Sequence, residues 1–246
     1  MRINIEIELE RNELPLDHRR IFLSLIKLGL TKLGGSETVG RWYGGAVQKP
    51  YTFSLFLPGA VFGETVTLSS PFVRMILSTN DYRCFGDMTN AMNRLRGIKV
   101  EVSGVRMSVI GITVGRETPV TGTEAEIKLL SPLVVRKHEP YAKHDRYVTA
   151  DDADFESELR ESVAAQLRML GLNEGLASTL RLIDKSRARR TVTTHFDRCF
   201  SVTVGRLKIA GSRELLEILS LVGMGSLRSS GFGMFDVISQ GGEIGG

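Results

Sequence analysis

Residues 223–233, with the sequence GMGSLRSSGFG, form the most informative stretch of the chain, and they lie between a predicted helix and a predicted strand. Glycines at four of these positions let the backbone adopt positive φ angles and approach a neighbouring group closely. The spacing fits neither a dinucleotide-binding motif nor a P-loop, both of which place the loop between a strand and a helix, in that order. Arg228 and the serines offer hydrogen-bond donors to phosphate, so the segment predicts a polyanion contact. The alternative is a tight turn from helix to strand.

The predicted elements on either side of this loop give both halves of the chain the same order, β-α-β-β-α-β. In the second half, apolar periodicity predicts a strand, a long helix, a hairpin, a short helix and a strand at residues 124–135, 151–170, 190–209, 212–222 and 232–238. In the first half it predicts two helices, at 17–33 and 85–95, and strands at 2–10, 51–57, 64–69, 73–77, 98–102 and 105–110. This pattern predicts an α+β protein of two tandem ferredoxin-like domains, a topology also found in the RNA-recognition sheet.

The boundary between the two predicted domains falls at the sequence TPVTGT, residues 118–123, which breaks the pattern. The first domain then spans residues 1–117 and the second spans residues 123–246. A length of 246 residues suits one large domain or two small ones, and the repeated pattern favours two.

Composition indicates an ordinary globular protein, because 42% of the residues are hydrophobic and 24% are charged. No apolar run is long enough to span a membrane, and the N-terminus lacks a signal-peptide core, so we expect a cytoplasmic protein. Cys84 and Cys199 lie far apart with no metal-ligand spacing around either. We therefore expect two buried thiols, no metal site and no cofactor.

Positive charge gathers in residues 181–208, whereas the net charge of the whole chain is only +4. The run KSRARR at 185–190 opens the predicted hairpin, and such a run is often just a solvated turn. Here more basic residues follow it in the hairpin itself, and a basic hairpin can track phosphates or enter an RNA groove. The charge therefore predicts that Arg187, Arg189 and Arg190 contact a polyanion, and the family resemblance given next implies that this polyanion is RNA.

The glycine-rich segment, together with the helix SRELLEILSLV before it and the strand FGMFDVI after it, resembles the closing motif of the RAMP superfamily of CRISPR-associated proteins. Three further segments are similar to the CRISPR RNA-processing endoribonucleases of that superfamily: DHRRIFLSLIKLGL at 17–30, KPYTFSLFLPG at 49–59 and SPLVVRK at 131–137. The resemblance covers nearly the whole chain, in order.

The resemblance implies a metal-independent endoribonuclease that cleaves CRISPR precursor RNA within each repeat. The RNA's own 2′-hydroxyl attacks the adjacent phosphate and leaves a 2′,3′-cyclic phosphate and a 5′-hydroxyl. The implied partner is the repeat RNA, and the resemblance also allows other proteins of an effector complex or a second copy in a homodimer. The RNA-binding residues that we predict in the glycine-rich segment are Gly223, Gly225, Arg228, Ser229, Gly231 and Gly233.

The family's catalytic positions fall on Lys27, Tyr43 and Lys49 when the chain is aligned on the KPYTFS segment. Many members have a histidine where this chain has Tyr43. Lysine can stabilise a pentacoordinate phosphate, and tyrosine or lysine can move protons when the pKa is depressed. Two alternatives are that Tyr43 packs against the sheet or a base, and that Lys49 is a plain phosphate contact. The rival function is a non-catalytic RAMP subunit that holds guide RNA.

The four histidines offer few replacements for the missing catalyst. His138 and His144 lie in a polar loop that could swing over RNA and supply an acid–base group, or could simply be solvated. We expect His18 to be a surface or capping residue and His195 to be a strand residue.

Overall fold

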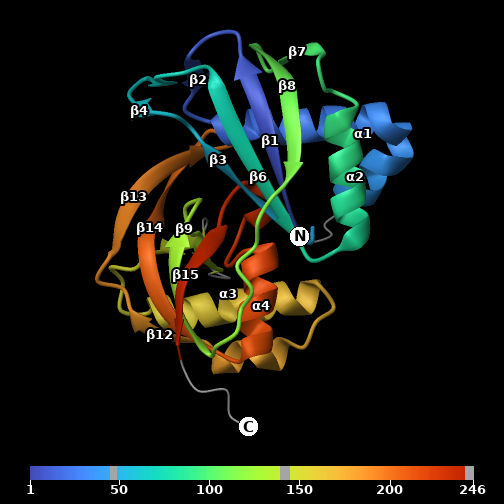
Figure 1. Ribbon diagram of the computed structural model, residues 1–246. Coiled ribbons are helices and arrows are strands. Elements are labelled where there is room, and N and C mark those ends of the chain that lie inside the picture. The colour runs from blue at the N-terminus through green and yellow to red at the C-terminus, as the bar shows by residue number, and fades with distance from the viewer. Residues whose placement is uncertain (45–48, 139–144, 242–246) are drawn as a thin grey trace.

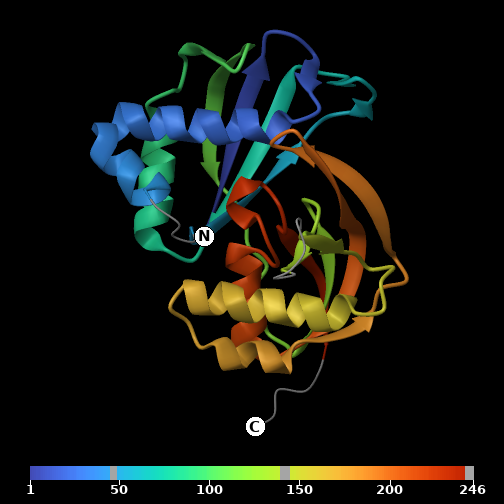
Figure 2. The same cartoon turned by 180° about the vertical axis from the view of Figure 1, so that it is seen from behind.

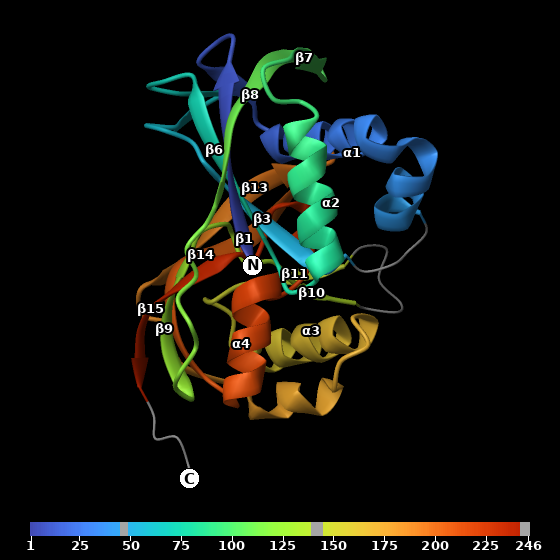
Figure 3. The ribbon, with the colours of Figure 1, turned by 45° about the vertical axis from the view of Figure 1, so that its right-hand side comes forward.

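A computed structural model of the chain describes residues 1–44, 49–138 and 145–241. Two antiparallel sheets, one built from residues 2–114 and the other from residues 124–241, lie one above the other in Figure 1. Each sheet carries its helices on the same side, as Figure 3 shows for α1 and α2 above and for α3 and α4 below.

The first sheet has the strand order β3-β6-β1-β8-β7. Its elements are β1 (Arg2–Leu9), α1 (His18–Tyr43), β3 (Tyr51–Phe56), β6 (Phe72–Thr79), α2 (Tyr82–Asn93), β7 (Lys99–Val102) and β8 (Val105–Val114). A small separate sheet joins β2 (Glu13–Pro15), β4 (Val61–Phe62) and β5 (Thr65–Thr67). The main strands give the ferredoxin-like order, in which the first and third strands are central.

The second sheet has the order β12-β14-β9-β15, and β13 pairs with the other end of β14. Its elements are β9 (Glu124–Leu129), α3 (Phe155–Met169), the 3₁₀ helix η1 (Glu174–Thr179), β12 (Arg181–Asp184), β13 (Ala188–His195), β14 (Arg198–Ala210), α4 (Arg213–Val222), the 3₁₀ helix η2 (Arg228–Ser230) and β15 (Phe235–Gly241). A two-stranded ribbon of β10 (Val135–Lys137) and β11 (Arg146–Val148) lies beside it. The order matches that of the first sheet, so the predicted tandem ferredoxin-like fold is confirmed.

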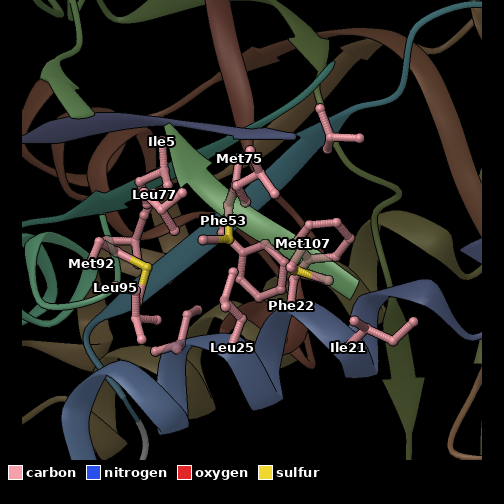
Figure 4. Close-up of a cluster of buried hydrophobic side chains, with 14 of the residues drawn as sticks. Ile5, Ile21, Phe22, Leu25, Phe53, Met75, Leu77, Met92, Leu95 and Met107 are labelled. Carbon is pink, nitrogen blue, oxygen red and sulfur yellow. The ribbon is translucent and has the colours of Figure 1, made fainter. Parts of the chain in front are cut away.

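The apolar residues that predicted these elements form the cores. Ile3, Ile5 and Ile7 alternate along β1 and are at most 1% exposed. Phe22 and Leu25, three positions apart on α1, pack on the same side of the sheet (Figure 4). A second cluster, around Phe155 of α3, fills the space under the second sheet.

Helix α1 extends beyond its predicted end. The predicted helix ended at residue 33, but Gly34 and Gly35 only kink it, with Gly35 at φ 61°, and helical structure resumes up to Tyr43. Trp42 anchors this last part, because its side chain is 8% exposed and its Nε1 donates to Asp87 of α2 at 2.9 Å. The chain beyond the predicted end at residue 33 is therefore helical up to Tyr43.

Several smaller expectations were wrong. Helix α3 begins at Phe155 rather than at residue 151, because the Asp152 carboxylate accepts from the Thr149 backbone N–H in a turn before the helix. Cys84 is buried as predicted, but Cys199 is exposed on the hairpin. Within the described ranges, no helix has the length and apolar character needed to cross a membrane. The domain limits at residues 117 and 123 stay a prediction.

Candidate functional site

The glycine-rich segment lies between the two sheets. In Figure 2 the red chain that follows α4 runs between α1 above it and α3 below it. Thr52 of β3 donates a hydrogen bond from Oγ1 to the Phe232 backbone oxygen at 2.8 Å, and both groups are buried. On the other side, Gln166 of α3 donates from Nε2 to the Gly223 oxygen at 2.9 Å. The segment therefore joins the first domain to the second.

The four predicted RNA-binding glycines have positive φ angles between 68° and 87° and are buried. A Cβ added to Gly231 would lie 2.6 Å from the Phe53 ring, and one added to Gly225 would lie 2.5 Å from the Val134 oxygen. At Gly233 the added Cβ would lie 2.0 Å from the Met224 oxygen, and at Gly223 it would lie 2.9 Å from the Gly233 oxygen. Glycine is required at these positions because the protein packs against itself, and RNA contact there stays a prediction.

Arg228 lies in the interior although we predicted a surface contact with phosphate. Its side chain is 1% exposed, and its Nη1 donates to the Val222 backbone oxygen at the end of α4 at 2.7 Å. Burial lowers the pKa of the guanidinium to about 10. A phosphate could reach this group only if the loop opened. Ser229, the other polar member of the predicted set, is half-buried.

A second contact between the domains joins the start of α1 to the tip of the β13–β14 hairpin. The Asp17 carboxylate accepts a hydrogen bond from the Phe196 backbone N–H at 2.8 Å and lies 3.3 Å from Nδ1 of His195. Arg19 donates from Nε to the Gly231 oxygen at 3.2 Å, and its guanidinium lies 4.7 Å from the centre of the Phe232 ring. The first turn of α1 thus holds both the hairpin and the glycine-rich segment.

His18 was predicted to be a surface or capping residue, but it is buried, and the N-cap position belongs to Asp17. The His18 side chain is 3% exposed, and burial next to Arg19 lowers the pKa of its imidazole to about 3. The ring packs near Phe62 with 6.3 Å between ring centres. Leu16 and Ile21 make the surroundings of this turn apolar. The expectation that the start of a helix is exposed does not take such neighbours into account.

Two of the three predicted catalytic residues lie together. The Lys49 Nζ lies 5.0 Å from the centre of the Tyr43 ring, and the Tyr43 hydroxyl is 3.1 Å from the Tyr51 hydroxyl. Burial raises the pKa of Tyr43 to about 12, whereas burial lowers the pKa of Lys49. At neutral pH the phenol therefore keeps its proton and cannot act as a base, while the lysine is easier to deprotonate than a free one.

Lys27 lies on a different part of α1 and is exposed. Positions 19, 23 and 27 recur at intervals of four along the helix, so they share one face. Arg19 on that face contacts the second domain through Gly231 and Thr193. Lys27 follows on the same face, two turns or about 12 Å further along the helix.

The predicted basic hairpin is open to solvent. Arg187, Arg189 and Arg190 are all exposed. Arg187 forms a salt bridge of 3.3 Å with Glu126, and Arg190 donates from Nε to the Ser201 hydroxyl at 3.0 Å. Neither contact encloses the guanidinium, so these side chains can meet a phosphate without rearrangement.

Of the two loop histidines, His138 is 80% exposed and its Nδ1 lies 2.9 Å from the Asp145 carboxylate, whereas His144 lies outside the described residues. Within residues 1–44, 49–138 and 145–241, no group of three or more His, Cys, Asp or Glu side chains could hold a metal ion. Sequence analysis missed Asp17 and Arg19 as domain contacts. No local signal gives such roles, because their partners are more than 170 positions away.

Comparison with known proteins agrees with this arrangement. Residues 116–237, which contain the second sheet and the glycine-rich segment, match the family model described as CRISPR associated protein Cas6, C-terminal. The chain belongs to the CRISPR-associated, RAMP-type repeat-processing family. No curated protein matches the chain.

Solved structures show that nearly the whole chain shares one fold with several other proteins. A structure titled as a Cas6-related gene from Pyrococcus furiosus superimposes with a TM-score of 0.81 at 18% identity, covering 98% of this chain and 99% of the other. A RAMP protein described as binding different RNA substrates gives 0.80, also at 18% identity, with 97% and 100% covered. A Cas6 product complex gives 0.70 at 16% identity, with 96% and 99% covered.

Proposed function

We propose that this Cas6-family protein binds CRISPR repeat RNA and cleaves it without a metal ion, through attack of the 2′-hydroxyl on the adjacent phosphate. The main support for the proposal is that the hairpin and the glycine-rich segment, both predicted to bind RNA, contact the same helix, α1, that holds the predicted catalytic residue Lys27. The hairpin residue Thr193 and the glycine-rich segment both contact Arg19, and Lys27 lies on the same face of that helix. RNA held along the exposed arginines can therefore extend along α1.

The chemistry assigned to the candidate residues follows from their protonation. Lys27 and Lys49 supply positive charge to the phosphorane that forms when the 2′-oxygen attacks. Lys49, whose pKa is lowered by burial, is the better proton donor to the 5′-oxygen that leaves. Tyr43 cannot take the proton from the 2′-hydroxyl, because its own pKa is about 12, so water accepts that proton as the 2′-oxygen attacks. With no imidazole in the family's usual position, we expect slow cleavage.

The experiment is a gel assay with the cognate repeat RNA in EDTA, beside a copy with a 2′-deoxy substitution at the cut site. Cleavage of only the unmodified RNA supports the nuclease. Lys49→Ala should then lower the cleavage rate by about 10²- to 10⁴-fold. Lys32→Ala, another exposed lysine on α1, is the matched control and should leave the rate unchanged.

The second candidate function is a RAMP subunit that holds repeat or guide RNA without cutting it. The Tyr43 hydroxyl favours this candidate, since it faces the fully buried Tyr51 instead of standing free as an acid–base group. This function predicts tight repeat binding with no product under any of the conditions above. Tyr43→Phe would then change stability slightly and leave RNA affinity unchanged.

A further inference from the structure

A groove of about 470 Å³ runs between α3 and the first part of the glycine-rich segment. The residues that matter here are Glu161, Ser162, Ala165 and Gln166 of α3, facing Ser226 and Leu227 across the groove. Its volume suits a small organic ligand such as a nucleobase with its ribose. Lys27, Tyr43 and Lys49 do not line it, whereas His138, which the sequence offered as a replacement acid–base group, does.

Gln166 gives this groove an unused acceptor. Its side chain is 2% exposed, and its Nε2 donates to the Gly223 oxygen at 2.9 Å. Because that partner is a carbonyl oxygen, the amide nitrogen must face it and Oε1 must point away. Among the described residues, Oε1 has no hydrogen-bond partner, and because the atom is itself buried, a ligand donor reaches it only when the wall of the groove shifts. A buried acceptor without a partner is costly, so a donor supplied by a ligand would relieve it.

The other polar groups of the groove favour a base over a phosphate. Glu161 is exposed and forms no ion pair within the described part of the chain. Three basic side chains also line the groove, and each lies against a carboxylate: Lys137 is 2.5 Å from Glu158, Arg136 is 3.4 Å from Asp145, and Nδ1 of His138 is 2.9 Å from Asp145. Ser162 and Ser226 place their hydroxyl oxygens 3.3 Å apart. A carboxylate and an unpaired amide oxygen would repel phosphate but accept from the N–H groups of a base.

We propose that this groove is a base-recognition pocket for single-stranded repeat RNA, and that it selects a base with an amino group, guanine first. The proposal rests on the proposed RNA binding and not on cleavage. The Watson–Crick edge of guanine presents two neighbouring donors, N1–H and the N2 amino group, which suit the acceptors of Glu161 and Gln166. Uracil presents one N–H between two carbonyl oxygens and fits poorly. Leu227 and Ala165 supply apolar surface for the ring.

The test measures binding of a repeat RNA panel in which each unpaired position carries each of the four bases in turn. For the unmodified protein, one position should prefer guanine over uracil by about 5- to 150-fold. Ala165→Trp fills the groove from an exposed position of α3 and should remove that preference. Arg168→Trp, on the same helix but outside the groove, is the matched control and should keep it. Glu161→Gln should shift the preference toward adenine, which pairs well with an amide.

Neither groove variant removes a basic residue, so the dependence of binding on salt should not change. The proposal is overturned if Ala165→Trp retains the base profile of the unmodified protein, or if no position shows a preference. A protein that shows the preference, loses it in Ala165→Trp and still does not cut RNA in EDTA supports the pocket while the nuclease assignment fails. A protein that cuts RNA with no base preference supports the nuclease and rejects the pocket.

Discussion

The glycine-rich segment and the basic hairpin were both predicted to hold RNA, yet the fold uses them in opposite ways. The four glycines and Arg228 of the first region are buried against β3, α3 and α4. The arginines of the second region are exposed, with Arg187 just before β13 and Arg189 and Arg190 on it. A sequence motif marks a position under strict constraint, but it does not say whether the constraint comes from a ligand or from the protein's own packing.

The largest effect on stability should come from the glycine-rich segment. Gly233→Ala should lower the free energy of unfolding by about 3 kcal/mol or more, because the new Cβ meets the Met224 oxygen at 2.0 Å and φ is 68°. Urea denaturation measures this change. Gly171→Ala is the matched control: its φ of 70° is equally strained, but no atom lies within 4 Å of the added Cβ. It should cost only about 1–2 kcal/mol. Equal losses in the two variants would show that packing adds nothing at Gly233.

Acid should weaken the fold where the hairpin tip meets α1. His18 has an unfolded pKa near 6.5 and a folded pKa of about 3, so its contribution to stability is present above pH 6.5 and is lost as pH falls toward 3. At pH 4.5 the free energy of unfolding should be about 2–3 kcal/mol lower than at neutral pH because of this group. The groups facing His18 are Arg19, the buried His195 and the backbone oxygen of Leu16, and burial also lowers the pKa of His195.

The measurement is the free energy of unfolding of His18→Asn and of the unmodified protein between pH 7.5 and pH 4.5. The difference in free energy of unfolding between the two proteins should shrink by about 2–3 kcal/mol as the pH falls. The reason is that only the unmodified protein must keep a neutral imidazole buried. His138→Asn is the control, since that side chain is 80% exposed. A constant gap across this range would mean that His18 is not held neutral.

The exposed hairpin should dominate the electrostatics of RNA binding. Replacing Arg187, Arg189 and Arg190 together by alanine should weaken repeat binding about 3- to 150-fold at low salt. The slope of log affinity against log salt should also fall by about 2–3, since each lost phosphate contact removes about 0.7–0.9. Fluorescence anisotropy over a salt series measures both. Urea denaturation should show a stability close to that of the unmodified protein, and an unchanged slope would remove the hairpin from the interface.

Sequence reasoning succeeded where a local pattern determines the structure and failed where a distant contact does. The alternation of Ile3, Ile5 and Ile7 and the helical spacing of Phe22 and Leu25 placed the sheet and its helix correctly. Asp17, the residue just before α1, makes no side-chain cap hydrogen bond and instead accepts from the Phe196 backbone N–H, 179 positions away. Nothing in the neighbouring residues encodes that contact.

For the candidate site, the family motif brought Tyr43 and Lys49 together correctly, because both lie within a few residues of β3. It could not reveal that the Tyr43 hydroxyl faces Tyr51, nor that Arg228 points inward. Both outcomes depend on how much apolar surface surrounds the group once the two domains pack. The pKa shifts of these residues are consequences of that burial and have no counterpart in residue spacing.

The smallest effect should come from Arg228 itself, and it gives the sharpest contrast between the two regions. Arg228→Met keeps the length of the side chain but removes a buried cation whose Nε and Nη2 have no partner among the described residues. The lost hydrogen bond to Val222 is offset by relief of that desolvation, so the free energy of unfolding should change by at most about 1–2 kcal/mol. The salt slope of repeat binding should stay the same, because the guanidinium does not face solvent. Arg189→Met, the matched exposed variant, should lower the slope by about 0.7–0.9. If Arg228→Met lowers the slope by the same amount, the loop opens when RNA binds, and the buried arginine is a phosphate contact after all.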